Sequence, residues 1–234
     1  MRRLILTILV ILCNAPALAT QPEVRGTLPI AGKIVPLPPG SWRVLNTFAE
    51  QVRTSDLRQA TTLHRALLVQ EHNGVAAAVI IVSAATEVST TWQPQGICTS
   101  TSNIRRHVEI AVRGSLDCRG LSNQTSGVGT RTPEWLLPLY RIGEGRPGWI
   151  PQRWISASVL LSEQMHYLSV EYRYAPSVFA PQSARNAANW SDGVRSSEQT
   201  DFVERLDRFS LAARAQLRHG LYGRQPTEPL AAPF

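Results

Sequence analysis

Runs of apolar residues separated by polar turns divide the chain into segments with strand-like and helix-like patterns. Two apolar runs, residues 65–71 and 75–83, flank His72-Asn73-Gly74, and an Asn-Gly pair readily adopts the positive φ angles of a tight hairpin turn. The second run is apolar at nearly every position, which is typical of a central strand covered on both faces. These residues predict an antiparallel hairpin in the middle of a sheet.

Four other segments are predicted to be strands, and two of them alternate between apolar and polar positions. Strands are expected over residues 32–37, from Ser41 onward, and over 154–161 and 166–174, the last two forming a second hairpin. After Ser41, one face is expected to hold Trp42, Val44, Asn46 and Phe48. In the last strand, the shared face is Leu168, Val170, Tyr172 and Tyr174.

Residues 107–113 also alternate strictly, and they predict a strand with one dry face and one wet face. The expected dry face is Val108, Ile110 and Val112. Residues 121–131 follow them along the chain and are rich in Ser, Asn, Gly and Thr, so a surface loop is expected there.

Two segments have the residues that begin helices. Thr132-Pro133-Glu134 combines an N-cap, a first-turn proline and an acid, and the helix is expected to end within residues 143–151. Ser196-Ser197-Glu198 opens the longest helix, which is expected to lie on the sheet. Its apolar stripe is Phe202, Leu206, Phe209, Ala213 and Leu217. The predicted fold class is α+β: a mostly antiparallel sheet packed by this long C-terminal helix and a shorter mid-chain helix.

The N-terminal residues predict an export signal. Two arginines precede the apolar run 4–12, and Ala17-Leu18-Ala19 has the small residues that a signal peptidase recognises. The expected division is a signal peptide over 1–19, a single α+β domain over 20–224 and a disordered, proline-rich tail over 225–234. Lipidation at Cys13 is the alternative, and the bulky residues before that cysteine argue against it. The apolar run is too short to span a bilayer.

The charge balance changes this picture little. The formal net charge is +7, from 24 basic and 17 acidic residues, and it includes Arg2 and Arg3 of the signal. The basic residues do not form the clustered stripes of a nucleic-acid-binding surface, so no nucleic-acid partner is expected. The expected location is the periplasm or the medium, with an unidentified component of the cell envelope as partner.

Cleavage of the signal leaves Cys98 and Cys118 as the only thiols. Two cysteines in an oxidising compartment predict a structural disulfide. A metal pair is the alternative, but His107 between them has no companion at ligand spacing.

Candidate chemistry is sparse, and no catalytic, cofactor-binding or metal-binding residue is assigned. Gly143-Glu144-Gly145-Arg146-Pro147-Gly148 matches GxGxxG, but it follows a predicted helix where a nucleotide fingerprint requires a strand. His107 and Glu109 are two titratable groups on one strand face, as a general base and its orienting carboxylate would be. Lys33, the only lysine, has no serine three residues before it. The six tryptophans are expected mainly in the core, with a sugar-binding groove as the alternative.

Several of these features occur together in one group of proteins. They are the export signal, the segment Leu37-Pro38-Pro39-Gly40-Ser41-Trp42, the pair Cys98 and Cys118, and a final helix ending in Gly220-Leu221-Tyr222-Gly223. The chain thus resembles uncharacterised exported proteobacterial proteins with an LPPGxW-like motif, although Arg119 stands where an aromatic residue is expected. The resemblance implies export and the disulfide, and it adds no catalytic residue. The leading hypothesis is an envelope-associated binding or accessory domain, and a hydrolase-like envelope enzyme is the alternative.

Overall fold

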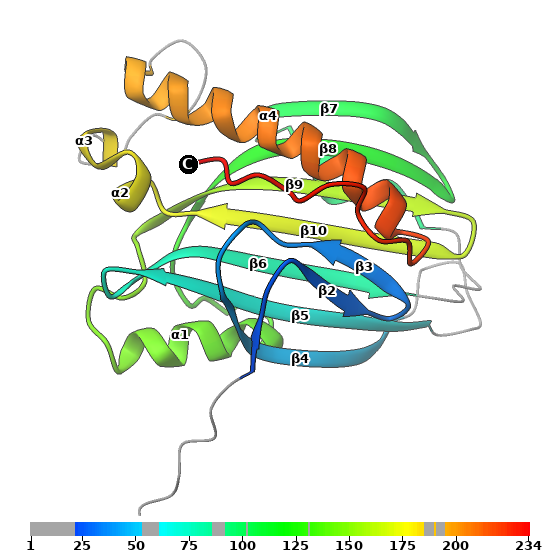
Figure 1. Ribbon diagram of the computed structural model, residues 1–234, viewed down its shortest axis with the longest axis horizontal. Coiled ribbons are helices and arrows are strands. Elements are labelled where there is room, and N and C mark those ends of the chain that lie inside the picture. Colours follow the sequence, from blue (N-terminus) through cyan, green and yellow to red (C-terminus); the bar gives the residue numbers. More distant parts are fainter. Residues whose placement is uncertain are drawn as a thin grey trace, which may run out of the picture.

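The computed structural model describes residues 22–52, 61–85, 92–101, 103–130, 132–184, 190 and 195–234. Within these ranges, eight strands form one antiparallel sheet (Figure 1). Their order across the sheet is β1 (Glu23–Val24), β4 (Trp42–Val52), β5 (Thr61–His72), β6 (Val75–Ala85), β10 (His166–Tyr174), β9 (Arg153–Glu163), β8 (Ser115–Thr125) and β7 (Asn103–Val112). The predicted signal peptide over residues 1–19 and its cleavage before Thr20 lie outside the described residues.

Both predicted hairpins are confirmed. β5 and β6 are joined through Asn73 and Gly74, whose φ angles are 50° and 76°, and every residue of β6 after Val75 is buried. β9 and β10 are joined through a turn in which Gln164 has a φ of 51°. A third hairpin, β2 (Thr27–Ile30) with β3 (Lys33–Pro36), lies against the sheet. These tight turns hold the sheet in register without long connections.

One face of the sheet is covered by α4 (Ser197–Gly220), as predicted. Ser196 caps the helix by a reciprocal pair of hydrogen bonds with Gln199, and the predicted apolar stripe is buried. Figure 1 shows α4 lying across β8 and β9, with the β2–β3 hairpin beside it. A Cβ on Gly220 would come within 1.8 Å of the carbonyl oxygen of Ile34, so the absence of a side chain lets the helix approach β3.

The opposite face carries two smaller apolar clusters. One packs under α1 (Leu137–Glu144) and the short 3₁₀ turn η2 (Glu134–Leu136), and it includes Trp149 and Trp154. The other lies under the 3₁₀ turn η1 (Gly96–Cys98). Two short helices, α2 (Pro176–Phe179) and α3 (Pro181–Ala184), follow β10. The arrangement confirms the predicted α+β class, with a long C-terminal helix and a shorter mid-chain helix.

Bulges overturn two predicted strand faces. The pairing of β4 with β5 shifts between Val44 and Asn46, so Leu45 is buried in the α1 cluster and the single shared face proposed after Ser41 is wrong. The pairing of β7 with β8 shifts between Val108 and Ile110. The predicted dry face of β7 is therefore wrong as well: Val108 is 42% exposed, Ile110 39% and Val112 59%.

Two segments expected to be irregular are ordered. β8 continues to Thr125, so the surface loop expected from Leu121 begins only after this residue. The segment 225–234, expected to be disordered, packs beside α4 (Figure 1), with Leu230 buried and Phe234 stacked on Phe202. The expected mid-chain helix starts with η2 after Pro133, while Thr132 accepts a hydrogen bond from the amide of Gly129. No helix in the described ranges is long and apolar enough to cross a membrane.

Candidate ligand-binding cleft

A cleft of about 850 Å³ lies on the sheet face opposite α4, between the two smaller apolar clusters. Its size is within the range of small-molecule binding sites. Its polar lining residues are Arg65, Ser83, Gln93, Gln95, Ser100, Ser122, Asn123, Gln124, Ser158, Ser169 and Glu171. Its apolar and aromatic lining includes Val52, Leu63, Ile81, Trp92, Ile97, Trp135, Leu160 and Tyr167.

The register of the central strands places serines side by side on the floor of the cleft. Ser83 on β6 pairs directly with Ser169 on β10, and Arg65 on β5 pairs with Ser83 from the other side. One row along, Glu171 on β10 pairs with Ser158 on β9. Because alternate residues of a strand face opposite sides of the sheet, the same strands present apolar residues to α4 and hydroxyl groups to the cleft. The sheet is thus amphipathic at its centre.

Arg65 is fixed on three sides. Its Nε donates to Glu50 Oε1 at 2.8 Å, and its Nη1 donates to Ser83 Oγ at 2.7 Å. Its guanidinium carbon lies 4.9 Å from the centroid of the Trp135 ring, within cation–π distance. The carbonyl oxygen of Trp135 in turn accepts a hydrogen bond from Asn46 Nδ2 at 3.1 Å. The positions of this arginine and this tryptophan are therefore set by three strands.

A second charged pair lies at the other end of the floor. Arg173 Nε donates to Glu171 Oε1 at 3.0 Å, and Gln124 Nε2 donates to the same oxygen at 2.6 Å. Gln124 is also hydrogen-bonded to Ser156 Oγ at 3.2 Å. The Glu171 carboxylate is thus held by partners from β8 and β10.

Aromatic side chains form part of the wall. Trp92 and Tyr167 are stacked with ring centroids 4.0 Å apart and an interplanar angle of 27°. Burial raises the pKa of Tyr167, and the charge of Arg65 and hydrogen bonds with Ser169 and Gln95 only partly oppose this. The phenol therefore stays neutral and acts as a hydrogen-bonding group.

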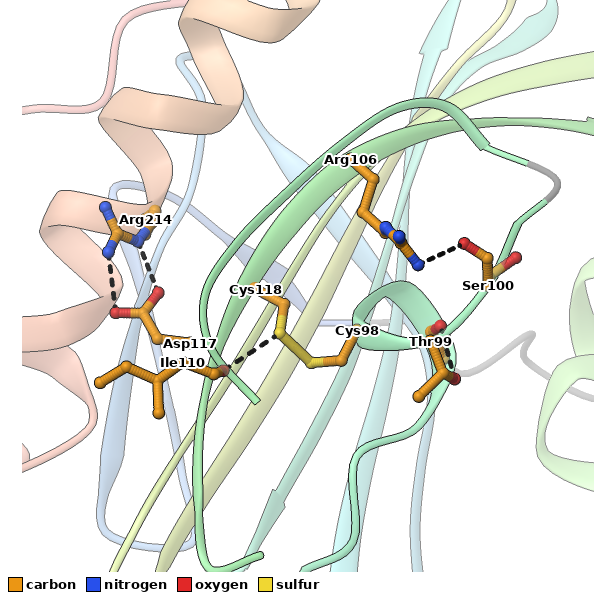
Figure 2. Close-up of a disulfide and its surroundings, with 9 residues drawn as sticks. Cys98, Thr99, Ser100, Arg106, Ile110, Asp117, Cys118 and Arg214 are labelled. Atoms are coloured by element: carbon orange, nitrogen blue, oxygen red, sulfur yellow. Dashed lines mark hydrogen bonds and ion pairs between the residues drawn. A yellow bond between two sulfur atoms is a disulfide. The ribbon is translucent and has the colours of Figure 1, made fainter. Parts of the chain in front are cut away.

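The predicted cysteine pair builds the wall beside η1. The sulfur atoms of Cys98 and Cys118 lie at disulfide distance, with Cα atoms 5.3 Å apart. Figure 2 shows Cys118 pointing toward η1 and its neighbour Asp117 pointing toward Arg214 of α4. The bond links η1 to the middle of β8. Gly120 permits this contact, since a Cβ there would lie 2.7 Å from Ile97.

The catalytic pair considered from the sequence lies elsewhere. His107 and Glu109 belong to β7 and contact α4 on the other face of the sheet. His107 Nε2 is 3.4 Å from Asp207 Oδ1, while Glu109 is 3.8 Å from Arg214. Burial alone would raise the pKa of Asp207, but its bonds to Arg119 and the surrounding positive charges lower it. These groups make polar contacts between β7, β8 and α4.

The remaining sequence motifs have structural positions. The GxGxxG segment forms the end of α1 and the turn before β9, so no strand precedes it. Among the tryptophans, Trp42, Trp149, Trp154 and Trp190 are fully buried. Trp92 and Trp135 line the cleft, which places two of the six where the sugar-groove alternative would need them. Lys33 is buried on the α4 face, with Nζ 2.6 Å from His166 Nδ1.

Sequence reasoning missed the cleft residues because they are spread over six strands. The only available signal was the placement of polar residues within otherwise apolar strands, such as Ser83 at the end of the β6 run and Ser169, Glu171 and Arg173 on β10. Such alternation predicts a solvated face. It does not show that loops and helices rise around that face to enclose it.

No protein-family model matches the chain, and the comparison with curated proteins found no match. One solved structure, described as the transcriptional regulator (GntR family) from Enterococcus faecalis V583, matches with a TM-score of 0.31 and 11% sequence identity. The match covers 58% of this chain and 94% of that chain. A likeness at this level supports no conclusion about fold or function, which must come from the site itself.

Proposed function

We propose that this protein is an exported binding domain of the cell envelope, and that it holds a small polar ligand in the cleft without reacting with it. The observation that carries the proposal is the polar floor of the cleft. Hydroxyl groups and two fixed ion pairs occupy the centre of the sheet, where further apolar packing would otherwise be expected. Polar groups placed in this way add specificity for a ligand rather than stability to the fold.

Two further observations support binding over catalysis. The carboxylates nearest the floor, Glu50 and Glu171, are each committed to an arginine, which favours positioning over proton transfer. The one acid–base pair suggested by the sequence, His107 and Glu109, faces α4 on the other side of the sheet. Export is supported by the signal-like N-terminus and by a cysteine pair placed for a disulfide.

The binding proposal is tested by thermal unfolding of the mature protein with four sets of compounds: neutral oligosaccharides, short peptides, phosphorylated metabolites and fatty acids. A ligand that binds only the folded state raises the melting temperature, and the shift grows with the ligand concentration. Ser158→Phe, which fills the cleft, should abolish the shift. Ser177→Phe, at an exposed position of α2 outside the cleft, should leave it unchanged. A shift that survives in Ser158→Phe would place binding elsewhere and contradict the proposal.

Export is tested separately by the intact mass of protein recovered from the periplasm or medium. The expected mass is that of residues 20–234. A diacylated N-terminal Cys13, or recovery only from the cytoplasm with the first nineteen residues retained, would contradict this part of the proposal.

A further inference from the structure

The charges of the cleft restrict the ligands that it accepts. Among the described lining residues, only Arg65 and Glu171 are charged, and each is already paired within the protein, with Glu50 and Arg173. An anionic or cationic ligand would lose its hydration here and find no unpaired counter-charge. The floor therefore favours a ligand without net charge.

The neutral lining has the hydrogen-bonding capacity that a polyol requires. Side-chain hydroxyls and amides both donate and accept, and the cleft presents five serines together with the amides of Asn123 and three glutamines. Sugar hydroxyls have the same dual character. Ser158 and Ser169 lie in adjacent rows of neighbouring strands, so they can contact successive hydroxyls of one ring.

Trp135 supplies an aromatic surface at one side of this floor. The residue is half-buried, its carbonyl is bound by Asn46, and Arg65 lies against its ring. A ring held this way loses little conformational freedom when a ligand stacks on it. The apolar C–H face of a pyranose ring matches such a surface, whereas a polar chain without ring faces does not.

From these three features we infer that the cleft binds a neutral glycan fragment, with a sugar ring stacked on Trp135 and its hydroxyls on the serine floor. This inference rests on the proposed function of the cleft as a binding site. It narrows the ligand from any small polar molecule to one chemical class, which a matched set of oligosaccharides distinguishes.

The experiment is a calorimetric titration of the mature protein with four tetrasaccharides: neutral glucose and N-acetylglucosamine oligomers, an acidic galacturonic acid oligomer and a cationic glucosamine oligomer. At least one neutral oligomer should bind, and the charged oligomers should bind at least about tenfold more weakly. Charged oligomers that bind as well as the neutral ones, or no binding of either neutral oligomer, would overturn the inference. If a peptide or phosphorylated compound still raises the melting temperature through the cleft, only the glycan class fails; if nothing does, the proposed function fails too.

Variants locate the binding on the cleft. Trp135→Ala should weaken binding of the neutral oligomer by at least about tenfold. Trp135→Phe, which keeps a ring face, should recover most of the lost affinity. Tyr222→Ala removes an exposed aromatic on the α4 side and is the matched control, with unchanged affinity expected. If Trp135→Ala fails to fold, Ser158→Val replaces it, because valine suits a strand and removes one floor hydroxyl. Equal affinity in the natural protein and in a folded Trp135→Ala or Ser158→Val variant would refute the assignment.

Discussion

The carboxylate of Asp117 on β8 accepts hydrogen bonds from Nε and Nη2 of Arg214 on α4, at 2.5 and 2.9 Å (Figure 2). Arg218, one turn further along the helix, donates to the same carboxylate from Nε at 2.8 Å. Asp117 is only 3% exposed, and its hydrogen bond raises the pKa of Arg214. This bidentate contact fixes the helix on the sheet at a set rotation, because a planar guanidinium fits a carboxylate in one orientation.

Replacing Asp117 by Asn should therefore destabilise the protein by about 3–5 kcal/mol, since it removes the buried counter-charge closest to Arg214 and leaves only Glu109, at 3.8 Å. Denaturant unfolding measures the change. Asp201→Asn is the matched control, because Asp201 pairs with Arg205 at the exposed surface of the same helix. This substitution should lower the free energy of unfolding by less than about 1 kcal/mol. Similar losses in the two variants would mean that the β8–α4 ion pair is solvated and unimportant.

The apolar face of α4 gives a second stability prediction. Phe209 and Leu206 are buried against the sheet, so truncating either to Ala should cost about 2–5 kcal/mol from lost burial and the cavity left behind. Arg205→Ala, on the exposed side, should cost far less. Thermal unfolding of the three variants compares the two faces directly. Equal melting shifts would show that the helix is not docked through this stripe.

These helix positions were predictable because α4 has an uninterrupted 3.6-residue pattern, and the β5–β6 hairpin was predictable because Asn73-Gly74 marks its turn. β7 was misjudged because alternation identifies two faces but not which one is covered. Here a bulge and an edge position leave Val112 in solvent, while the polar face pairs with α4. The cleft was invisible because its residues converge only when distant strands pair.

Because Lys33 is buried, we expect an unusual dependence of stability on pH. The residue is 1% exposed, and burial lowers its pKa from 10.5 to about 8, so the unfolded chain holds this proton more tightly than the folded protein. The free energy of unfolding should then rise between pH 8 and about 9.5, below the range in which tyrosines titrate. Burial also lowers the pKa of His166, with the charge of Lys33 acting in the same direction, so stability should fall as His166 becomes protonated in acid.

Lys33→Met should remove the alkaline part of this dependence. Replacing a buried cation by an apolar side chain of similar length should stabilise the protein at pH 7 by about 1–3 kcal/mol, despite the loss of the contact with His166. Lys33→Arg keeps a charge that cannot be released and should be less stable than the natural protein. Urea unfolding at pH 7, 8 and about 9.5 tests both variants. A less stable Lys33→Met, or an unchanged pH profile, would contradict the prediction.

The Cys98–Cys118 bond should support stability and the wall of the cleft. Replacing both residues by Ser should lower the free energy of unfolding by about 2–4 kcal/mol while the sheet still forms. Ligand affinity should fall as well, because η1 carries Ile97 and lies beside Gln95 on the cleft wall. Melting curves with and without a reductant give the same comparison for the natural protein. Two alkylatable thiols in protein taken from the periplasm would show that the bond does not form there.

The C-terminal segment provides the last prediction, because its order depends on aromatic contacts rather than on regular structure. Phe234 is stacked on Phe202 and Phe179, with ring centroids 4.4 and 4.9 Å apart, and Leu230 is buried in the core under α4. Deleting residues 229–234 should cost about 2–4 kcal/mol, since it exposes this apolar surface to water. Phe234→Ala should account for a large part of the loss, whereas Ala232→Ser, at an exposed position, should be nearly neutral. Amide exchange and limited proteolysis provide an independent measure of order in this segment. Rapid cleavage of the natural chain after residue 225, with no loss of stability on deletion, would show that the segment is disordered, as its prolines predicted.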